Sequence, residues 1–261
     1  MRLSPHNRRV ARLRRLTRDP DARRSEGVFV AEGPKLLAAA LDAGAPLEGL
    51  YVAPGAPGDL VGRATADSVP VYQLDPDVLR RVADSVTPQP VLAVVRRIDV
   101  PLDAVADGDP LVACVDLRDP GNLGAILRTA EATGIGAVIC CAGTVDVYNP
   151  KCVRASAGAL FRLPLVAGGE PEPVLEMLGR WGHRRLAAQA AGGLPPERCD
   201  LRRPTAIVLG NEGHGLPPAL GSLVDERVTI PMAGAVESLN VSIAAAVLCF
   251  EVARQRRAAA E

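Results

Sequence analysis

Aromatic residues are scarce in this chain of 261 residues, because Phe, Trp and Tyr together make up only 3% of it. Hydrophobic residues still account for 48%, so we expect a sizeable core that consists mainly of Ala, Val and Leu. The chain lacks any apolar run close to the ~20 residues that cross a bilayer, and its start is basic. We therefore expect no membrane span, no signal peptide and a cytoplasmic location.

The patterns of several common site types are also missing. The six cysteines form no Cys-x-x-Cys pair and have no histidine at ligand spacing, which favours buried free thiols over disulfides or a metal site. The nearest match to a dinucleotide-binding Gly-x-Gly-x-x-Gly turn, at 134–139, ends a helix and enters a strand, which is the wrong context. Gly-Lys-Ser/Thr and Gly-x-Ser-x-Gly turns are absent as well.

Lysine is nearly absent, since only Lys35 and Lys151 are found among the 30 basic residues. The formal net charge is zero, which by itself argues against a nucleic-acid partner. However, residues 1–30 contain nine Arg and three acidic residues, a formal side-chain charge of +6. A GC-rich genome accounts for the preference for Arg but not for its clustering at one end, and Arg is suited to phosphate contacts.

The first half of the chain has the pattern of a compact α/β unit. Its predicted elements are a basic helix at about 5–18, a strand and a helix that ends at Gly44, strands at 47–54, 69–75 and 89–97, and a short helix at about 75–85. A stretch with proline and several acidic residues then breaks the pattern. We predict a first domain over 1–97, a linker over 98–109 and a second domain over 110–261.

The second domain alternates apolar strands with helices. Strands are expected at 111–117, 136–141, 161–166, 184–190, 205–210 and 227–232, and helices at about 122–133, 150–158, 171–181 and 238–257. This alternation predicts a mostly parallel sheet that is covered on both faces. Ligands of such sheets bind at the carboxyl ends of the strands, so the loops there are the place to look for chemistry.

Three of these loops carry polar residues. After the first strand, Asn122 is a candidate N-cap, and the long side chain of Arg128 can reach back over the strand ends. After the fifth strand, Gly210–Gly213 forms a turn that exposes Glu212. Before the last helix, Ser238 is a candidate N-cap close to Asn240. Taken singly, each loop is also explained as a tight turn or as a capped core helix.

The last helix has an apolar stripe, which we predict to face the core. Its members are Leu239, Ile243, Val247 and Phe250.

Together the three loops form an ordered set of motifs: Asn-x-Gly-x-x-x-Arg-Thr-Ala, then Gly-Asn-Glu-Gly, then Ile-Pro-Met followed by Glu-Ser-Leu-Asn-Val-Ser. This set resembles the three motifs of the SpoU (TrmH-type) RNA ribose 2'-O-methyltransferases of the SPOUT class. The likeness covers about residues 110–257. The basic unit before it resembles the small RNA-binding domain, akin to certain ribosomal proteins, that many members of this family carry, on its pattern, its position and "AEGPKLL".

The resemblance implies an α/β domain with a parallel sheet whose C-terminal segment forms a deep trefoil knot, a feature almost absent from other proteins. It implies S-adenosyl-L-methionine as the cofactor and, in most members, a homodimer with the active site near the interface. The cofactor residues carried over from the second and third motifs are Leu209, Gly210, Gly213, Ile230, Met232 and Leu239.

The implied reaction transfers a methyl group to a ribose 2'-hydroxyl of RNA. The expected substrate is 23S rRNA, because a separate N-terminal domain favours rRNA over tRNA. In this reading Arg128 binds phosphate and stabilises developing oxyanion charge, because a guanidinium is effectively always protonated. Of the other catalytic candidates, Asn122 and Asn240 orient these groups, Glu212 holds an Asn or Arg in place, and Ser238 contributes a hydrogen bond. The candidate RNA-binding residues are Arg8, Arg9, Arg12, Lys35 and Arg154.

Two alternatives stay open. The chain can act on tRNA, or it can be a non-catalytic RNA-binding factor with the same fold. The joint presence of Asn122, Arg128, Glu212 and Asn240 favours catalysis. The nucleotide that is methylated, a role in antibiotic resistance and the identity of the proton acceptor do not follow from the sequence.

Overall fold

The computed structural model describes residues 2–260, and the chain divides into two compact units. Unit 1 is made of Met1–Ile98 and Tyr148–Arg162, and unit 2 is made of Asp99–Val147 and Leu163–Glu261. The short segment Tyr148–Arg162, which follows β7 in sequence, thus has most of its contacts in unit 1, although we assigned it to the second domain from the sequence.

Unit 1 contains a five-stranded sheet in the order β1-β4-β3-β5-β2. Its strands are β1 (Arg2–Leu3), β2 (Val28–Glu32), β3 (Leu47–Val52), β4 (Val71–Leu74) and β5 (Val91–Arg96). β5 runs antiparallel to β2 and β3, whereas β4 runs parallel to β3 and β1. All of these strands except β1 lie where the sequence predicts them. β1 has two residues, too few for a periodic pattern.

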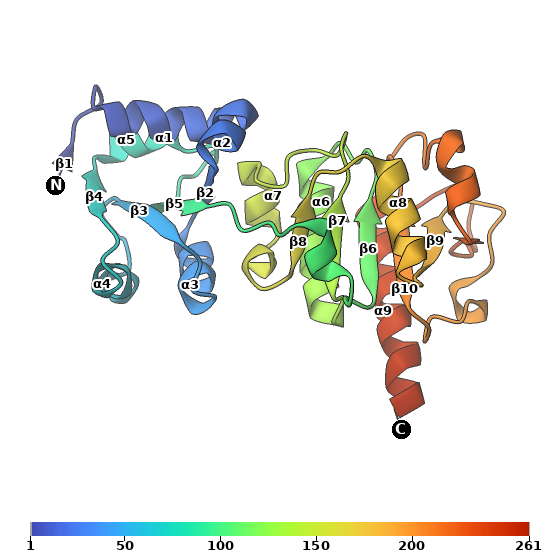
Figure 1. Ribbon diagram of the computed structural model, residues 1–261. Helices are drawn as coiled ribbons and strands as arrows, with labels where there is room; N and C mark the ends of the chain where they lie inside the picture. The colour runs from blue at the N-terminus through green and yellow to red at the C-terminus, as the bar shows by residue number, and fades with distance from the viewer. Residues whose placement is uncertain (1, 261) are drawn as a thin grey trace. The chain divides into compact units, whose positions relative to one another are not determined.

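Helices cover both faces of this sheet (Figure 1). One face is covered by α1 (Arg8–Arg18), α2 (Pro20–Glu26) and α5 (Pro76–Val82), and the other by α3 (Pro34–Asp42) and α4 (Gly58–Ala66). α1 starts later than predicted because Asn7 caps it, accepting a hydrogen bond from the Arg9 N–H. α4 was not predicted, since its sequence, GDLVGRATA, contains two glycines, which weaken a helical pattern.

The segment that returns to unit 1 contributes α7 (Pro150–Ala155) and the 3-10 turn η2 (Ala159–Phe161). α7 packs on β2, and three of the few aromatic rings meet there. The Phe29 ring centroid lies 4.6 Å from that of Tyr148 and 6.0 Å from that of Phe161. A unit that ended at residue 97 would therefore lose part of its aromatic core.

Unit 2 contains a six-stranded parallel sheet in the order β11-β9-β10-β6-β7-β8. Its strands are β6 (Leu111–Cys114), β7 (Ala137–Cys140), β8 (Leu165–Ala167), β9 (Arg184–Ala188), β10 (Thr205–Leu209) and β11 (Glu226–Val228). All six predicted strands exist and the predicted parallel sheet is confirmed, but β8 and β11 overlap their predicted ranges, 161–166 and 227–232, by only two residues each. The trefoil knot stays a prediction.

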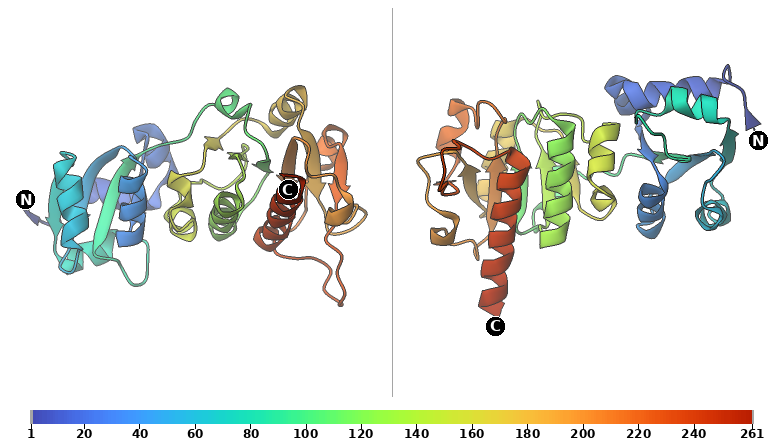
Figure 2. Two further views of the ribbon diagram at one scale, coloured as in Figure 1. Left: turned by 90° about the horizontal axis from the view of Figure 1, so that it is seen from below. Right: turned by 180° about the vertical axis from the view of Figure 1, so that it is seen from behind.

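One face of this sheet packs on α8 (Pro171–Arg180) and the 3-10 turns η1 (Leu102–Val105) and η4 (Pro218–Leu223). On the other face α6 (Pro120–Thr133) and α9 (Val241–Ala260) lie side by side (Figure 2). The 3-10 turn η3 (Pro196–Arg198) packs on α9. These two long helices begin at the carboxyl edge of the sheet, where the three motif loops meet.

The helix caps differ from those expected. Asn122 is not the N-cap of α6, because the side chain of Asp119 accepts the hydrogen bond of the Asn122 N–H, and the helix starts at Pro120. Ser238 is not the cap of α9, because Asn240 accepts from the Ser242 N–H at 2.8 Å. Both predictions were wrong for the same reason: several Asp, Asn and Ser residues compete in each loop, and all are good caps.

The buried face of α9 was also assigned wrongly. Ile243, Val247 and Phe250 are 52%, 40% and 55% exposed, and the residues that face the core are Ala245, Leu248, Cys249 and Val252. Both sets recur at helical spacing, so periodicity alone cannot choose between them. The outcome leaves a row of large apolar side chains on the surface of α9.

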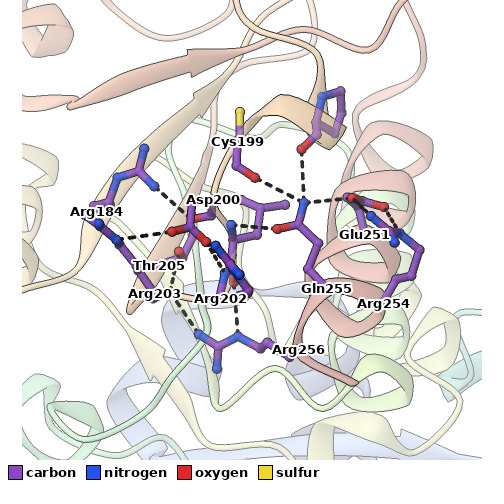
Figure 3. Close-up of polar contacts among 12 residues, drawn as sticks. Arg184, Cys199, Asp200, Arg202, Arg203, Thr205, Glu251, Arg254, Gln255 and Arg256 are labelled. Atoms are coloured by element: carbon purple, nitrogen blue, oxygen red, sulfur yellow. Dashed lines mark hydrogen bonds and ion pairs between the residues drawn. The ribbon is translucent and has the colours of Figure 1, made fainter. Parts of the chain in front are cut away.

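The C-terminal half of α9 is held by a polar cluster with the loop that follows β9 (Figure 3). The Gln255 amide accepts from the Leu201 N–H at 3.0 Å and donates to the Cys199 carbonyl at 3.1 Å. Arg256 Nη2 lies 2.7 Å from both carboxylate oxygens of Asp109 and donates to the Arg203 carbonyl. These contacts fix the axis of the helix whose other end carries Asn240.

We expect Arg256→Ala to lower the free energy of unfolding by about 1–3 kcal/mol, because it removes one partly buried donor group from the Asp109 carboxylate and from the carbonyl oxygens of Leu201, Asp109 and Arg203. Arg257→Ala is the matched control, since the neighbouring Arg257 is exposed, and it is expected to stay within about 0.5 kcal/mol. Urea unfolding of the three proteins measures the difference. Equal losses in the two variants would contradict this role for Arg256.

The six cysteines are buried free thiols, as predicted. Burial raises the pKa of Cys141 and of Cys249 to about 12, so both thiols stay protonated and unreactive at neutral pH. Across residues 2–260, His, Cys, Asp and Glu side chains form no group that could bind a metal ion. The same residues include no helix with the length and apolar character needed to cross a membrane.

Candidate active site

The carboxylate of Glu212 lies where the loop after β10 meets the start of α6. It accepts hydrogen bonds from the backbone N–H of Arg118 at 3.1 Å and of Asp119 at 3.1 Å, and from the Asn122 side-chain amide at 3.1 Å. β6 and β10 are parallel neighbours, so the loops at their carboxyl ends are adjacent although they are more than 90 residues apart in sequence. Glu212 therefore ties the second motif to the first.

Asn240 extends this connection to the third motif. Its side-chain Nδ2 donates to Asn122 Oδ1 at 3.0 Å, and its Oδ1 accepts from the N–H and hydroxyl of Ser242 at 2.8 and 2.7 Å. One continuous chain of side-chain hydrogen bonds thus joins Glu212, Asn122 and Asn240. The structure brings three of the five predicted catalytic residues together, each with a defined partner.

The pKa of Glu212 lies below its ordinary value. Partial burial raises it, but the hydrogen bonds from Asn122 and from the backbone N–H groups of the loop outweigh that effect and stabilise the charged form. Glu212 is therefore ionised at neutral pH. Since its oxygens already accept several N–H groups, it is suited to hold the loops in place.

We expect Glu212→Gln to lower the free energy of unfolding at pH 7 by about 1 kcal/mol, because an amide replaces an acceptor that three donors use. A carboxylate with a lowered pKa stabilises the fold above the ordinary pKa of 4.5, and this contribution is lost as the pH falls through the lowered value. The gap between wild type and variant in urea unfolding should therefore shrink below pH 4.5. The control is Glu197→Gln, an exposed carboxylate, for which a similar pH-dependent gap would refute the assignment.

A cavity of about 430 Å³ lies beside this chain of hydrogen bonds. All six residues predicted to bind the cofactor line it, and so do Glu212 and Ser238. Further lining residues were not predicted from the sequence, among them Gln189, His214 and Glu237. Gln189 directly follows β9, a strand that the sequence predicts, but no role was assigned to the residues at the end of that strand. Knowing that β9 lies next to β10 in the sheet would have identified Gln189 as a candidate lining residue.

One wall of the cavity depends on a glycine. A Cβ added to Gly210 would lie 2.4 Å from the backbone of Gly215 and Leu216, so the two arms of this loop touch through Gly210. Within the described chain, Glu212 and Glu237 line the cavity and no Lys or Arg does. Such a cavity suits a ligand with positive charge and disfavours one rich in phosphate.

A second, open pocket lies beside the cavity and shares Asn211, Glu212 and Gly213 with it. It is polar, and its other lining residues are Arg118, Asp119, Asn122 and Asn240. Arg118 and Asn211 were not among the residues chosen from the sequence. Two signals could have identified them: Asn211 is a polar residue of the Gly-Asn-Glu-Gly turn, and Arg118 is the first cation after β6.

Arg128 does not lie in either pocket of this chain. It is exposed on α6, and no hydrogen bond or ion pair of its side chain is found among residues 2–260. It follows Asn122 by six residues, which places it roughly 9 Å further along the helix and about 120° around it. The expectation that Arg128 reaches back over the pocket within one chain is therefore not met.

The candidate RNA-binding residues all belong to unit 1. Arg8, Arg9 and Lys35 are exposed, and the Arg9 guanidinium lies 4.8 Å from the centre of the Tyr72 ring. Arg12 and Arg154 are engaged in ion pairs instead, with Glu26 and Glu48 and with Asp84 and Glu32, respectively. The first three are free to contact a polyanion, whereas the last two stabilise the unit.

Comparison with known proteins agrees with this geometry. Residues 109–250 match the SpoU rRNA methylase family, and residues 7–93 match the MRM3-like substrate binding domain. The 23S rRNA (guanosine(2553)-2'-O)-methyltransferase RlmP of Bacillus subtilis is 33% identical over 69% of this chain and 71% of that protein. A 23S rRNA (uridine(2479)-2'-O)-methyltransferase of Streptomyces viridochromogenes is 31% identical over 98% of this chain and 92% of that protein.

Solved structures confirm the α/β fold and its parallel sheet. An AdoMet-bound rRNA methyltransferase from Sinorhizobium meliloti superposes with a TM-score of 0.87 at 30% identity, over 97% of each chain. AdoMet is S-adenosylmethionine, the cofactor that the three motifs imply. The match to the family domain covers more than half of the sequence and contains all three motifs. The chain therefore belongs to the SpoU rRNA methylase family.

Proposed function

We propose that this protein transfers a methyl group from S-adenosylmethionine to a ribose 2'-hydroxyl of 23S rRNA. The observation that carries the proposal is the pairing of the two pockets. A cavity of about 430 Å³ lies beside an open polar pocket, and Glu212, which belongs to both, is bonded to Asn122 and through it to Asn240. The names of the relatives that act on 23S rRNA support this choice of substrate over tRNA.

The residues of the cavity fit the cofactor. Leu209, Ile230 and Leu239 provide apolar surface for the adenine, and Glu212 and Glu237 provide negative charge near a sulfonium and an ammonium group. The absence of Lys and Arg from the described lining is consistent with a ligand that carries no phosphate. Bound there, the cofactor supplies an electrophilic methyl group.

The protein's own residues then position the acceptor. A ribose 2'-hydroxyl is a weak acid, so methyl transfer depends on its orientation and on stabilisation of developing negative charge. Asn122 and Asn240 line the open polar pocket, and their amide groups can orient a hydroxyl there. Glu212 acts through Asn122 as a positioning residue. Ser238 lines the cavity and contributes a hydroxyl close to the reacting groups.

We further propose a homodimer that forms through the exposed apolar row of α9: Ile243, Val247 and Phe250. Large apolar side chains aligned on one helix are typical of a surface that a partner covers. α6, which carries Arg128, packs beside α9. In the dimer Arg128 would therefore serve the pocket of the other subunit, where its guanidinium binds phosphate and stabilises oxyanion charge.

Unit 1 would bind the RNA through its exposed cations Arg8, Arg9 and Lys35. Contacts of this kind are sequence-independent and weaken with salt. With rRNA as substrate and reduced cysteines throughout, the protein is assigned to the cytoplasm. The C-terminal segment is expected to form the trefoil knot that is typical of the family.

The direct test is transfer of tritium from labelled S-adenosylmethionine to an unmodified 23S rRNA transcript, with a tRNA transcript as the comparison. Mapping of 2'-O-methyl positions then identifies the nucleotide. Label on tRNA but not on 23S rRNA would overturn the substrate, and binding of both ligands without any transfer would favour a non-catalytic RNA-binding factor.

A further inference from the structure

The side chain of Arg118 lies at the mouth of the polar pocket, and no part of the proposed reaction has used it. It is 69% exposed, and its Nη2 lies 2.5 Å from Asp116 Oδ1. Its backbone N–H binds Glu212, so the residue cannot drift away from the site. An exposed cation with a fixed backbone is thus built into the loop that leads into α6.

Asp116 holds the guanidinium in a specific place. Asp116 has a φ of 57°, in the left-handed region that few residues other than glycine adopt. This conformation is stabilised by Asn211, whose side-chain amide donates to the Asp116 carbonyl at 2.9 Å and to its carboxylate at 3.2 Å. Asn211 belongs to the loop that also lines the cofactor cavity. The position of Arg118 is therefore tied to the cofactor loop through two residues.

The charge balance of the pocket shows why a cation is needed there. Two carboxylates, Asp119 and Glu212, line the pocket, and Asp116 lies next to them. Among the described residues that line it, Arg118 is the only cation. An RNA segment brings further negative charge, since every ribose is flanked by phosphates. Asp116 binds only some of the five N–H donors of the Arg118 guanidinium, so the other donors are free to bind a phosphate.

We infer that Arg118 binds an RNA phosphate next to the target ribose and is a substrate-positioning residue distinct from Arg128. This inference rests on the proposed function, because it takes the polar pocket as the place where the ribose binds. The contact adds affinity for RNA and sets the register of the strand over the pocket, while the groups that act on the 2'-hydroxyl are others.

The test compares full-length wild type with Arg118→Ala, Arg118→Lys and Arg202→Ala, using an unmodified 23S rRNA transcript. Arg202 is the matched control, because it is 61% exposed and pairs at 2.8 Å with Asp200, also two residues before it (Figure 3). We expect Arg118→Ala to raise the RNA Kd and KM by about 10-fold with kcat nearly unchanged. We expect Arg118→Lys to recover most of the affinity, since an ammonium also binds phosphate.

Salt dependence gives a second readout that a merely structural role would not change. The slope of log K against log salt should fall by roughly 0.7 in Arg118→Ala, the value for one phosphate of a single strand, and stay unchanged in Arg202→Ala. An unaltered affinity for S-adenosylmethionine shows that the site is intact. A wild-type Kd and slope, a loss of kcat at unchanged RNA affinity, or equal effects in Arg202→Ala would each overturn the inference. Absence of methyl transfer in wild type would instead refute the proposed function.

Discussion

Gly210→Ala is expected to raise the Kd for S-adenosylmethionine by about 10- to 100-fold, because overpacking against backbone costs roughly 1–3 kcal/mol. The added Cβ would lie 2.4 Å from the Gly215 carbonyl carbon and from the Leu216 nitrogen. Neither atom belongs to a flexible side chain, so the loop itself must move. That loop forms one wall of the cofactor cavity and carries Glu212.

The matched control is Gly221→Ala in η4, outside the cavity. There the nearest atom to an added Cβ is Arg227 Nη2 at 3.9 Å, an ordinary contact, so the substitution is expected to change the Kd by about 3-fold at most. Isothermal titration with S-adenosylmethionine measures both variants. If Gly210→Ala binds as tightly as wild type, the close approach of the two loop arms is not what shapes the cavity.

The sequence predicts the fold of unit 2 more completely than the arrangement of the residues in its candidate site. Six apolar strands separated by helices are enough to predict a parallel sheet, and the carboxyl ends of β6 and β10 are where its chemistry lies. The resemblance of the three motifs to the family also made Glu212, Asn122 and Asn240 candidates. It could not show that they form one chain of hydrogen bonds, because that depends on the order of strands in the sheet, which brings together loops over 90 residues apart.

The errors have physical causes that are equally specific. Periodicity in α9 permits two apolar faces, and only packing against α6 selects the one with Leu248 and Val252. The start of a helix depends on which of several nearby polar residues caps it, and at α6 that residue is Asp119 and not Asn122. An RNA contact of Arg154 stays a prediction, and the sequence could not show that Asp84 and Glu32 form ion pairs with it in unit 1.

Arg128 gives the second large effect, and it tests the dimer at the same time. We expect Arg128→Ala to lower kcat by about 100- to 1,000-fold, in the range found when one group that stabilises developing charge is removed. The affinity for S-adenosylmethionine should not change, because Arg128 lies outside the cofactor cavity. Labelling of an unmodified 23S rRNA transcript measures kcat. A variant that labels as fast as wild type would exclude Arg128 from the reaction.

Mixing Arg128→Ala with Gly210→Ala decides which subunit Arg128 serves. If it acts on the pocket of the partner, one of the two sites in each mixed dimer has both an intact cavity and an intact Arg128. Random reassociation of equal amounts makes half of the dimers mixed, so activity should recover to about a quarter of wild type. The S-adenosylmethionine concentration is kept above the Kd of wild type and well below that of Gly210→Ala. If Arg128 serves its own subunit, every site in the mixture then carries one defect and activity does not rise above that of the separate variants. Phe250→Asp in both chains should prevent recovery, because it places a charge in the apolar row through which the dimer is proposed to form.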